Sequence, residues 1–343
     1  MSKRRAASKR KTRHDEGDEM EEEAEKVSEA EADSKVELTQ QETPARKSDS
    51  SATTDTPPPP PPTAAPAAKR RRRTAKDDKA ETDKPPPLAP RTTASSFGKE
   101  ILIGAHVSAS GGVHNTIPNA LHIGANAFAL FLRSQRKWSS PPLDPAARRS
   151  FRVLGELHGY DPAAHMLPHG SYLVNLAQPD AAKAALAYAC FVDDLRRCAQ
   201  LGIRLYNFHP GSAVDGSTKE EAVRRIAAHL NAAHRETAAG ADDDGPGGDD
   251  GPGVPGGVVT VLENMAGSGN VVGSRFEELR DIIALVDDKD RVGVCIDTCH
   301  AFAAGYDMRT QDAFDRTMRE FDEIVGLKYL KALHREFAPL SLQ

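Results

Sequence analysis

Short apolar stretches alternate with helix-like stretches from about residue 99 onward. Seven stretches have the apolar, β-branched character and the length of strands: residues 101–106, 127–132, 164–169, 204–209, 258–263, 292–297 and 329–334. The longer stretches between them repeat apolar side chains every three or four positions, which is the period of an α-helix. Alternation of strands and helices is typical of β-α units around a parallel sheet. The pattern therefore predicts an α/β fold.

Two of the expected helices have recognisable ends. Residues 180–202 are expected to form a helix that ends at Gly202, because glycine readily adopts the left-handed conformation that follows a helix. Its buried side would hold Leu186, Cys190, Phe191, Leu195 and Cys198. Ser217 and Glu220 have the spacing of a capping box, which predicts the start of the next helix.

That second helix has a buried stripe of Val223, Ile226 and Leu230. His229 and His234 fall outside the stripe, so we expect both to face solvent.

Composition divides the 343-residue chain in two. Residues 1–98 hold 20 Lys and Arg and 19 Asp and Glu, long proline runs and almost no aromatic side chains. Such a segment cannot bury enough apolar surface to fold, so a disordered tail is expected. Residues 99–343 have a length that suits one α/β barrel as well as two smaller domains, and we expect a single domain. An acidic, glycine-rich insert at 240–257 is expected to be a disordered loop.

Two basic clusters in the tail, at residues 3–11 and 69–73, resemble signals read by nuclear import receptors. We therefore expect a nuclear protein, with the mitochondrion as a second location. Contact of the tail with DNA phosphates is an open alternative.

Several protein classes are excluded. Four cysteines are too few for a disulfide scaffold, and the first thirty residues lack the apolar core of a secretion signal. The longest apolar run has nine residues, whereas a membrane span needs about 20. The net charge of the folded part is −6, which argues against general nucleic-acid binding but permits an enzyme whose carboxylates bind cations.

Polar side chains end the predicted strands. His106, His169, His209, Glu263, Asp297 and His334 each occupy the last position of a strand, and His300 follows the sixth strand by three residues. The carboxyl ends of parallel strands in a barrel lie at one face, so these side chains should converge. Imidazoles and carboxylates without cysteine suit zinc or manganese, and paired metals suit hydrolysis of phosphate esters.

Seven motifs now carry a family resemblance. They are IGAHVSASGG (103–112), AFALF (127–131), SQRKW (134–138), LPHGSYLVNL (167–176), NFHPGS (207–212), LEN (262–264) and VCIDTCHAFAAGYD (294–307). In this order they resemble the endonuclease IV family of apurinic/apyrimidinic (AP) endonucleases. The resemblance implies a (β/α)8 barrel with three zinc ions. It also implies cleavage of the phosphodiester 5′ to an abasic site and removal of blocking groups from 3′ ends in base excision repair.

Site roles follow from the same resemblance. His169 and His209 would bind one zinc ion, and Glu263, as the catalytic centre, would bridge it to a second. Asp297 and His334 would complete much of the second site, and His300 would belong to the third.

Further residues would act beside the metals. His106 would orient a ligand or a water rather than bind an ion. Gln135 and Arg136 would contact the DNA, with Arg136 entering the base stack, while Tyr172 and Leu173 would wedge the duplex and hold the extruded sugar. The expected substrate is double-stranded DNA with abasic sites or blocked 3′ ends, bound by a monomer.

The resemblance stops after His334. The motif that supplies the rest of the third zinc site and the eighth strand with its glutamate do not follow. We therefore expect a barrel without its last strand–helix unit, from a truncated gene model or an alternatively spliced product of a complete enzyme. If that form is real, low solubility and weak or absent nuclease activity are expected.

Two alternatives stay open at this stage. A metal-dependent sugar isomerase or epimerase also carries His, Glu and Asp at the strand ends of a barrel. A remnant that binds damaged DNA without cutting it would fit the missing ligands.

Overall fold

The computed structural model describes residues 101–238 and 253–335 of the chain. The tail at 1–98, most of the 240–257 insert and the segment after Arg335 lie outside the described residues. The predictions made for those segments therefore stay predictions.

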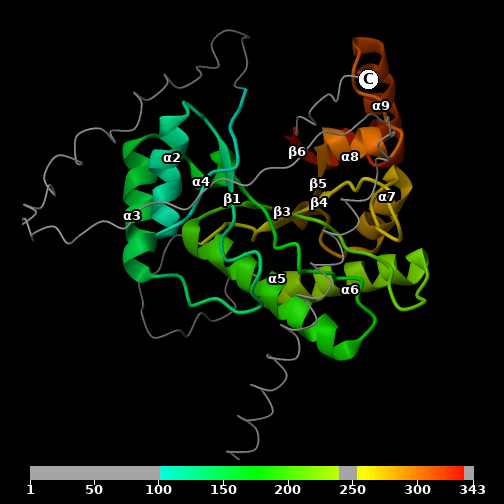
Figure 1. Cartoon of the computed structure of the whole chain (residues 1–343), viewed down its shortest axis with the longest axis horizontal. Helices are drawn as coiled ribbons and strands as arrows, with labels where there is room; N and C mark the ends of the chain where they lie inside the picture. Colours follow the sequence, from blue (N-terminus) through cyan, green and yellow to red (C-terminus); the bar gives the residue numbers. More distant parts are fainter. Residues whose placement is uncertain (1–100, 239–252, 336–343) are drawn as a thin grey trace, which may run out of the picture. The chain divides into compact units, whose positions relative to one another are not determined.

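All strands of the described part run parallel. They are β1 (Phe128–Leu130), β2 (Met166–Pro168), β3 (Leu205–Phe208), β4 (Val259–Glu263), β5 (Val292–Asp297) and β6 (Leu330–His334). β1 pairs with β2, and β3 to β6 pair in chain order. Bridges from His106 to Ala129 and from His169 to Asn207 extend this order at both sides of the β1–β2 pair. The strands therefore follow one another in chain order, and their carboxyl ends meet at one face (Figure 1).

The strand predictions differ in accuracy. β5 has the predicted bounds, and the other strands lie within their predicted ranges but are shorter. Residues 101–106 form no regular strand, although their backbone bonds to residues 126–129 keep them beside β1. The predicted start of the strand at 164 was wrong, because helix α4 (Pro162–His165) occupies that stretch. Asp161 caps this helix by accepting the Ala163 N–H, and Pro162 has the φ angle that a first helical turn needs.

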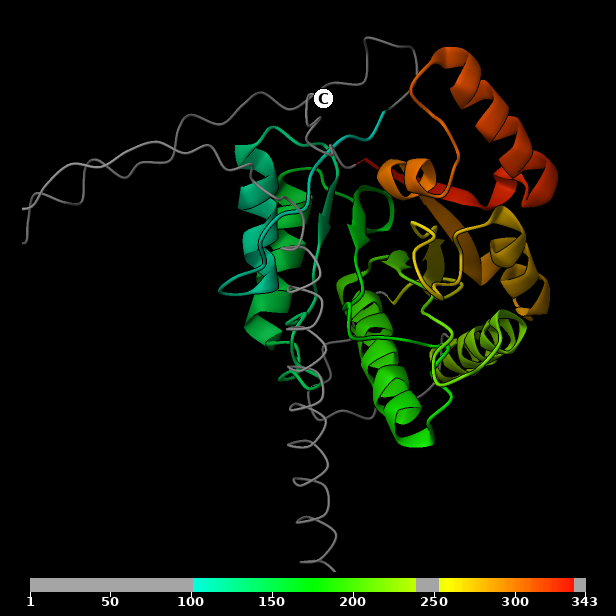
Figure 2. The same cartoon turned by 45° about the vertical axis from the view of Figure 1, so that its right-hand side comes forward.

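Helices cover the outer side of the strands (Figure 2). The longer ones are α2 (Thr116–His122), α3 (Pro145–Leu157), α5 (Ala181–Leu201), α6 (Lys219–Glu236), α7 (Phe276–Leu285), α8 (Thr298–Ala303) and α9 (Gln311–Ile324). Short 3-10 turns are η2 (Val113–Asn115), η3 (Lys289–Arg291) and η4 (Leu327–Tyr329).

Helix α5 confirms the helix predicted at 180–202. Its first turn is capped by Asp180, whose side chain accepts the N–H groups of Ala182 and Lys183. Gly202 ends the helix in the left-handed conformation, with φ 77°. Cys190 and Cys198 are buried, as predicted.

Helix α6 required two corrections. Its capping box is formed by Thr218 and Glu221, one residue later than predicted. The stripe of apolar residues is buried as predicted, but His234 is only 5 % exposed rather than solvent-facing. The reason is a second, polar contact of the helix, since His234 Nε2 lies 3.0 Å from Thr260 Oγ1 on β4. Periodicity of apolar residues does not reveal such a contact.

The central strands are buried on both sides. Val259, Val261 and Cys295 form a small apolar cluster on the side that also carries Glu263, while Thr260 on the other side faces α6. Alternation along β4 therefore directs Glu263 inward, away from the helices. β6 is less covered, and Leu333 is 54 % exposed.

No helix within residues 101–238 and 253–335 combines the length and the apolar character of a membrane span.

Candidate metal centre

Five elements place one side chain each at the carboxyl face of the sheet. Glu263, Asp297 and His334 are the last residues of β4, β5 and β6, while His169 and His209 directly follow β2 and β3. The prediction that the strand-end residues converge is thus confirmed for this set. The parallel topology brings together side chains that are up to 165 residues apart in sequence, from His169 to His334.

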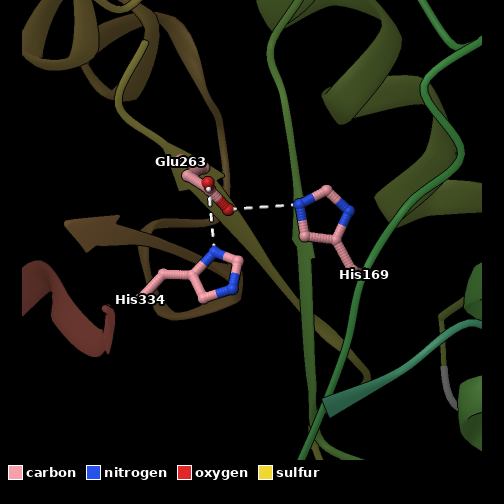
Figure 3. A group of neighbouring side chains, drawn as sticks. All are labelled: His169, Glu263 and His334. Atoms are coloured by element: carbon pink, nitrogen blue, oxygen red, sulfur yellow. Dashed lines mark hydrogen bonds and ion pairs between the residues drawn. The ribbon is translucent and has the colours of Figure 1, made fainter. Parts of the chain in front are cut away.

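Glu263 lies at the centre of the cluster and is fully buried. Its Oε2 lies 3.3 Å from His169 Nε2, and its Oε1 lies 3.3 Å from His334 Nδ1 (Figure 3). His209 Nε2 and His300 Nδ1 each lie 3.5 Å from Oε1. One carboxylate therefore contacts four imidazoles.

Asp297 forms the second carboxylate of the cluster. Its Oδ2 lies 3.5 Å from His334 Nδ1, and its Oδ1 lies 3.7 Å from His300 Nδ1. Asp297 also caps α8, because Oδ1 accepts the backbone N–H of His300 at 2.6 Å. This cap holds His300 at the cluster although it is not a strand residue. Asp297 Oδ2 is buried and has no hydrogen-bond partner in the described residues.

The cluster shifts the pKa values of its two carboxyl groups in opposite directions. Burial by itself would raise the pKa of Glu263, but hydrogen bonds with His169, His209 and His334 outweigh burial and hold that pKa well below its usual value. For Asp297, burial dominates and raises the pKa, opposed by the His300 N–H and by the charges of His300 and His334.

The orientation of His169 is fixed from outside the cluster. Its Nδ1 lies 2.8 Å from the carbonyl oxygen of Gly170, which requires the proton to be on Nδ1. When His169 is neutral, Nε2, which faces Glu263, therefore carries the lone pair that a metal ligand needs, whereas in the charged ring the same nitrogen donates to Glu263.

The donors fit divalent metal ions. Ligand atoms within 4.8 Å of one another form two groups, His169–Glu263–His334 and His209–Glu263–His300, which share Glu263. Imidazole and carboxylate without thiolate suit zinc or manganese, and Asp297 Oδ2, which accepts no hydrogen bond from the described residues, is an additional donor. Which ligands share which ion stays a prediction.

Two asparagines support the carboxylates and received no role from the sequence. Asn207 Nδ2 donates a hydrogen bond to Glu263 Oε2. Asn264 Oδ1 accepts the backbone N–H of Asp297 at 2.6 Å. Both belong to motifs that the sequence displays, NFHPGS and LEN, so position beside a ligand was the available signal.

His106 lies beside the cluster but belongs to neither ligand group. Its ring centroid is 4.3 Å from that of Phe131. The residue as a whole is exposed, yet packing of its ring lowers its pKa to about 4, with help from the nearby His169 and His334. A neutral imidazole beside the candidate ligands agrees with its expected role, which remains a prediction.

The four residues expected to contact DNA belong to two segments, one of which touches the cluster through Tyr172. Tyr172 is 61 % exposed, and its ring centroid lies 5.7 Å from that of His169 and 5.6 Å from that of His209. Leu173 follows it in a half-buried position. Gln135 and Arg136 follow β1 and line a groove of about 700 Å³ together with His106.

Comparisons with known proteins agree with this arrangement. Residues 117–338 match the family described as xylose isomerase-like TIM barrel. "Apurinic-apyrimidinic endonuclease 1" of Plasmodium berghei is 47 % identical over 234 residues, which cover 68 % of this chain and 42 % of the relative. "Probable endonuclease 4" of Chlorobium luteolum is 47 % identical over 232 residues, covering 68 % of this chain and 76 % of the relative.

A solved structure shares the fold. The crystal structure of endonuclease IV from Thermus thermophilus superposes with a TM-score of 0.55 and 32 % identity, over 68 % of this chain and 76 % of that chain. The chain spans less than half of the length of the Plasmodium relative.

Proposed function

The chain belongs to the endonuclease IV family of xylose isomerase-like TIM barrels, and from this premise we propose that it is a zinc-dependent AP endonuclease. It would hydrolyse the phosphodiester 5′ to an abasic site in double-stranded DNA and trim blocked 3′ ends. We further propose that the protein is a monomer, that it acts in the nucleus, and that import receptors bind its basic tail.

One observation carries the proposal: a fully buried glutamate that contacts four imidazoles at the carboxyl face of a parallel sheet. An isolated buried carboxylate is costly, and its usual justification is a charged partner or a metal. The flanking Tyr172 and Arg136 support a DNA substrate, since an exposed aromatic ring and a cation next to a metal cluster suit an opened duplex.

The metal ligands would be His169, His209, Glu263, Asp297, His300 and His334. Bound zinc would supply Lewis-acid polarisation of the phosphate and a hydroxide nucleophile near neutral pH. Glu263 stays ionised in the buried site, so it balances positive charge there without taking up a proton near neutral pH. Gly170 keeps His169 in the ligating tautomer through its carbonyl oxygen.

The surrounding residues would select the substrate. Tyr172 and Leu173 would enter the opened duplex and exclude water from the cluster, while Arg136 would fill the space of the missing base. Extrusion costs least where a base is already absent, which favours abasic sites.

The test uses the full 343-residue chain and a duplex oligonucleotide with one tetrahydrofuran abasic analogue. We expect a nick on the 5′ side of the analogue, loss of nicking with a chelator and recovery with zinc. Glu263→Gln should abolish both nicking and zinc retention, while Glu236→Gln, the same change in an exposed ion pair with Arg196, should affect neither. A second duplex with a 3′-phosphoglycolate end measures the trimming activity.

Two results would reject the proposal. If the protein retains zinc in a Glu263-dependent manner but does not nick the duplex, it has a metal site and is not a nuclease. If that protein also epimerises ketoses, it is a sugar enzyme. Nicking that persists in Glu263→Gln with a chelator would show that the cluster does not carry the activity.

Gel filtration with light scattering tests whether the protein is a monomer. Imaging of a variant that lacks residues 1–98 tests whether the tail directs the protein to the nucleus.

A further inference from the structure

A largely buried cluster of four charged side chains lies outside the metal centre, between α5 and the segment that follows β1. It comprises Arg133, Asp193, Asp194 and Arg197, and we call it the α5 charge cluster. Asp193 Oδ2 accepts hydrogen bonds from both arginines, from Arg133 Nη1 at 2.8 Å and from Arg197 Nε at 2.9 Å. The side chains of Arg133, Asp194 and Arg197 are 4 %, 2 % and 6 % exposed, whereas that of Asp193 reaches the surface.

The two arginines also hold the backbone of the segment 133–143. Arg133 Nη2 donates to the carbonyl oxygens of Trp138 at 2.5 Å and Lys137 at 3.4 Å. Arg197 Nη2 donates to the carbonyl oxygen of Pro141 at 2.7 Å. The segment is therefore attached to α5 at Arg133 and at Pro141, while Arg133 also bonds the beginning of the segment to its middle.

Gln135 and Arg136 lie between these attachment points. Neither side chain takes part in the cluster, and Arg136 is exposed. The path of the backbone through them is therefore set by bonds that leave both side chains available to a ligand. A guanidinium suits this task because its planar fork can bond a carboxylate and carbonyl oxygens at the same time.

The second recognition segment is tied to the first. Ser171 Oγ donates to the carbonyl oxygen of Gln135 at 3.0 Å and accepts the backbone N–H of Leu173 at 3.3 Å. A change in the path of 133–143 would therefore move the Tyr172–Leu173 wedge as well.

Stability alone does not explain buried charges at this position. Apolar side chains of similar volume often stabilise a fold as well as a buried ionic cluster, whereas charged groups fix one arrangement of the chain. Asp194 also accepts a hydrogen bond from Tyr206 Oη at 2.7 Å, and its Oδ1 lies 3.9 Å from Arg133 Nε. Neither Oδ1 nor that Nε has a hydrogen-bond partner in the described residues.

We propose that Arg133, Asp193 and Arg197 are positioning residues for damage recognition, which hold the 133–143 segment so that Gln135 and Arg136 meet the DNA in a fixed geometry. The inference rests on the proposed function, since it assigns a task within DNA binding. It predicts that the cluster affects substrate binding and not the metal-dependent step.

The chain offers a direct readout. Trp138 is its only tryptophan, and its carbonyl oxygen is bonded to Arg133. Quenching of its fluorescence by acrylamide therefore reports on the segment in the absence of DNA. We expect a higher quenching constant in Asp193→Asn, because the new amide lacks the charge of the carboxylate. We expect the same in Arg133→Lys, because an ammonium group cannot make the several directed hydrogen bonds of the guanidinium. In both variants the segment around Trp138 should be held less tightly. The control is Arg196→Gln, which removes an exposed ion pair from the same helix.

Kinetics complete the test. Asp193→Asn should raise both KM and Kd for the abasic duplex about tenfold, because the loosened segment would have to become ordered when DNA binds. The kcat at saturating DNA and the zinc content should stay at the wild-type values. Arg133→Lys should show the same split between KM and kcat, so the proposal remains testable if one variant fails to fold.

The outcomes separate the two proposals. If wild type cuts the abasic duplex and both variants match it in KM and quenching, the positioning role is overturned. Equal losses of kcat and zinc would overturn it too, since the cluster would then serve the metal centre. If wild type neither binds nor cuts the duplex, the proposed function fails, and the quenching comparison alone decides whether the cluster holds the segment.

Discussion

The carboxyl group of Asp194 provides a quantitative prediction about stability. Burial raises the pKa of Asp194 from its ordinary value of 3.8 to about 7, although Tyr206 and Arg133 oppose the rise. The folded chain therefore binds this proton more tightly than the unfolded chain does. Its contribution to stability is fully present below about pH 4 and is lost as the pH rises through about 7.

The magnitude follows from the two pKa values. Each pH unit between them changes the free energy of unfolding by about 1.4 kcal/mol, so the full window corresponds to roughly 4 kcal/mol. Asp194→Asn removes the titration. The free energy of unfolding of wild type relative to this variant should therefore fall by up to this amount from about pH 4 to about pH 8.

The assay is urea unfolding of wild type and Asp194→Asn at matched pH values, with a chelator present so that metal ligands do not dominate. Comparison with the variant cancels the titration of all other groups. Tyr206→Phe is an informative second variant, because loss of its hydrogen bond should move the upper end of the window above about pH 7. If the difference in unfolding free energy between wild type and Asp194→Asn does not vary with pH, or grows as the pH rises, the reasoning is refuted.

Two further predictions concern the site, and a third concerns the stability of the loop that follows β3. Glu263→Gln should weaken zinc binding by more than about tenfold, measured by competition with a chromophoric chelator, whereas His106→Asn should cost less because His106 is outside both ligand groups. Arg136→Ala should weaken binding of an abasic duplex by about 1–3 kcal/mol in a fluorescence anisotropy titration, with unchanged zinc content. Gly211→Ala should lower the free energy of unfolding by about 1–3 kcal/mol, because Gly211 has φ 124° and a methyl group there would collide with Asn175 Oδ1.

Contrary results are equally specific. Equal zinc loss in Glu263→Gln and His106→Asn would contradict the assignment of Glu263 as a ligand and of His106 as a residue beside the ligands. Zinc loss in Arg136→Ala would place that residue in the metal centre instead of on the DNA. A Gly211→Ala variant as stable as wild type would mean that Asn175 can move without cost.

The convergence of the candidate ligands was predictable, because the end of a parallel strand lies at a known face of the sheet however far apart the strands are in sequence. Five of the seven predicted strands end at the candidate ligands His169, His209, Glu263, Asp297 and His334, and the parallel topology makes those ends meet. His300 was the exception, since it lies in a helix, but its spacing of three from Asp297 is that of a capped first turn.

The α5 charge cluster was not predicted, because charged residues on a helix usually face solvent. Asp194 did offer a signal: it lies four residues after Cys190 and four before Cys198, and therefore on the face expected to be buried. His234 was misjudged for a related reason. A stripe of apolar residues defines one buried face, while polar contacts with Thr260 and Arg291 create another.

The start of β2 illustrates the limit of local patterns. Residues 164–169 read as a continuous strand, but Asp161 and Pro162 begin a helical turn that lasts until His165. The helix-starting pair Asp161 and Pro162 therefore makes residues up to His165 helical, although the apolar run from 164 indicates a strand.

His334 belongs to β6, the least covered strand of the described sheet, and it reaches Glu263 on β4 and Asp297 on β5. An ion held by these side chains would therefore cross-link three neighbouring strands. Removal of the ion with a chelator should increase the rate of amide hydrogen exchange in β6 before the rate increases in the interior of β4.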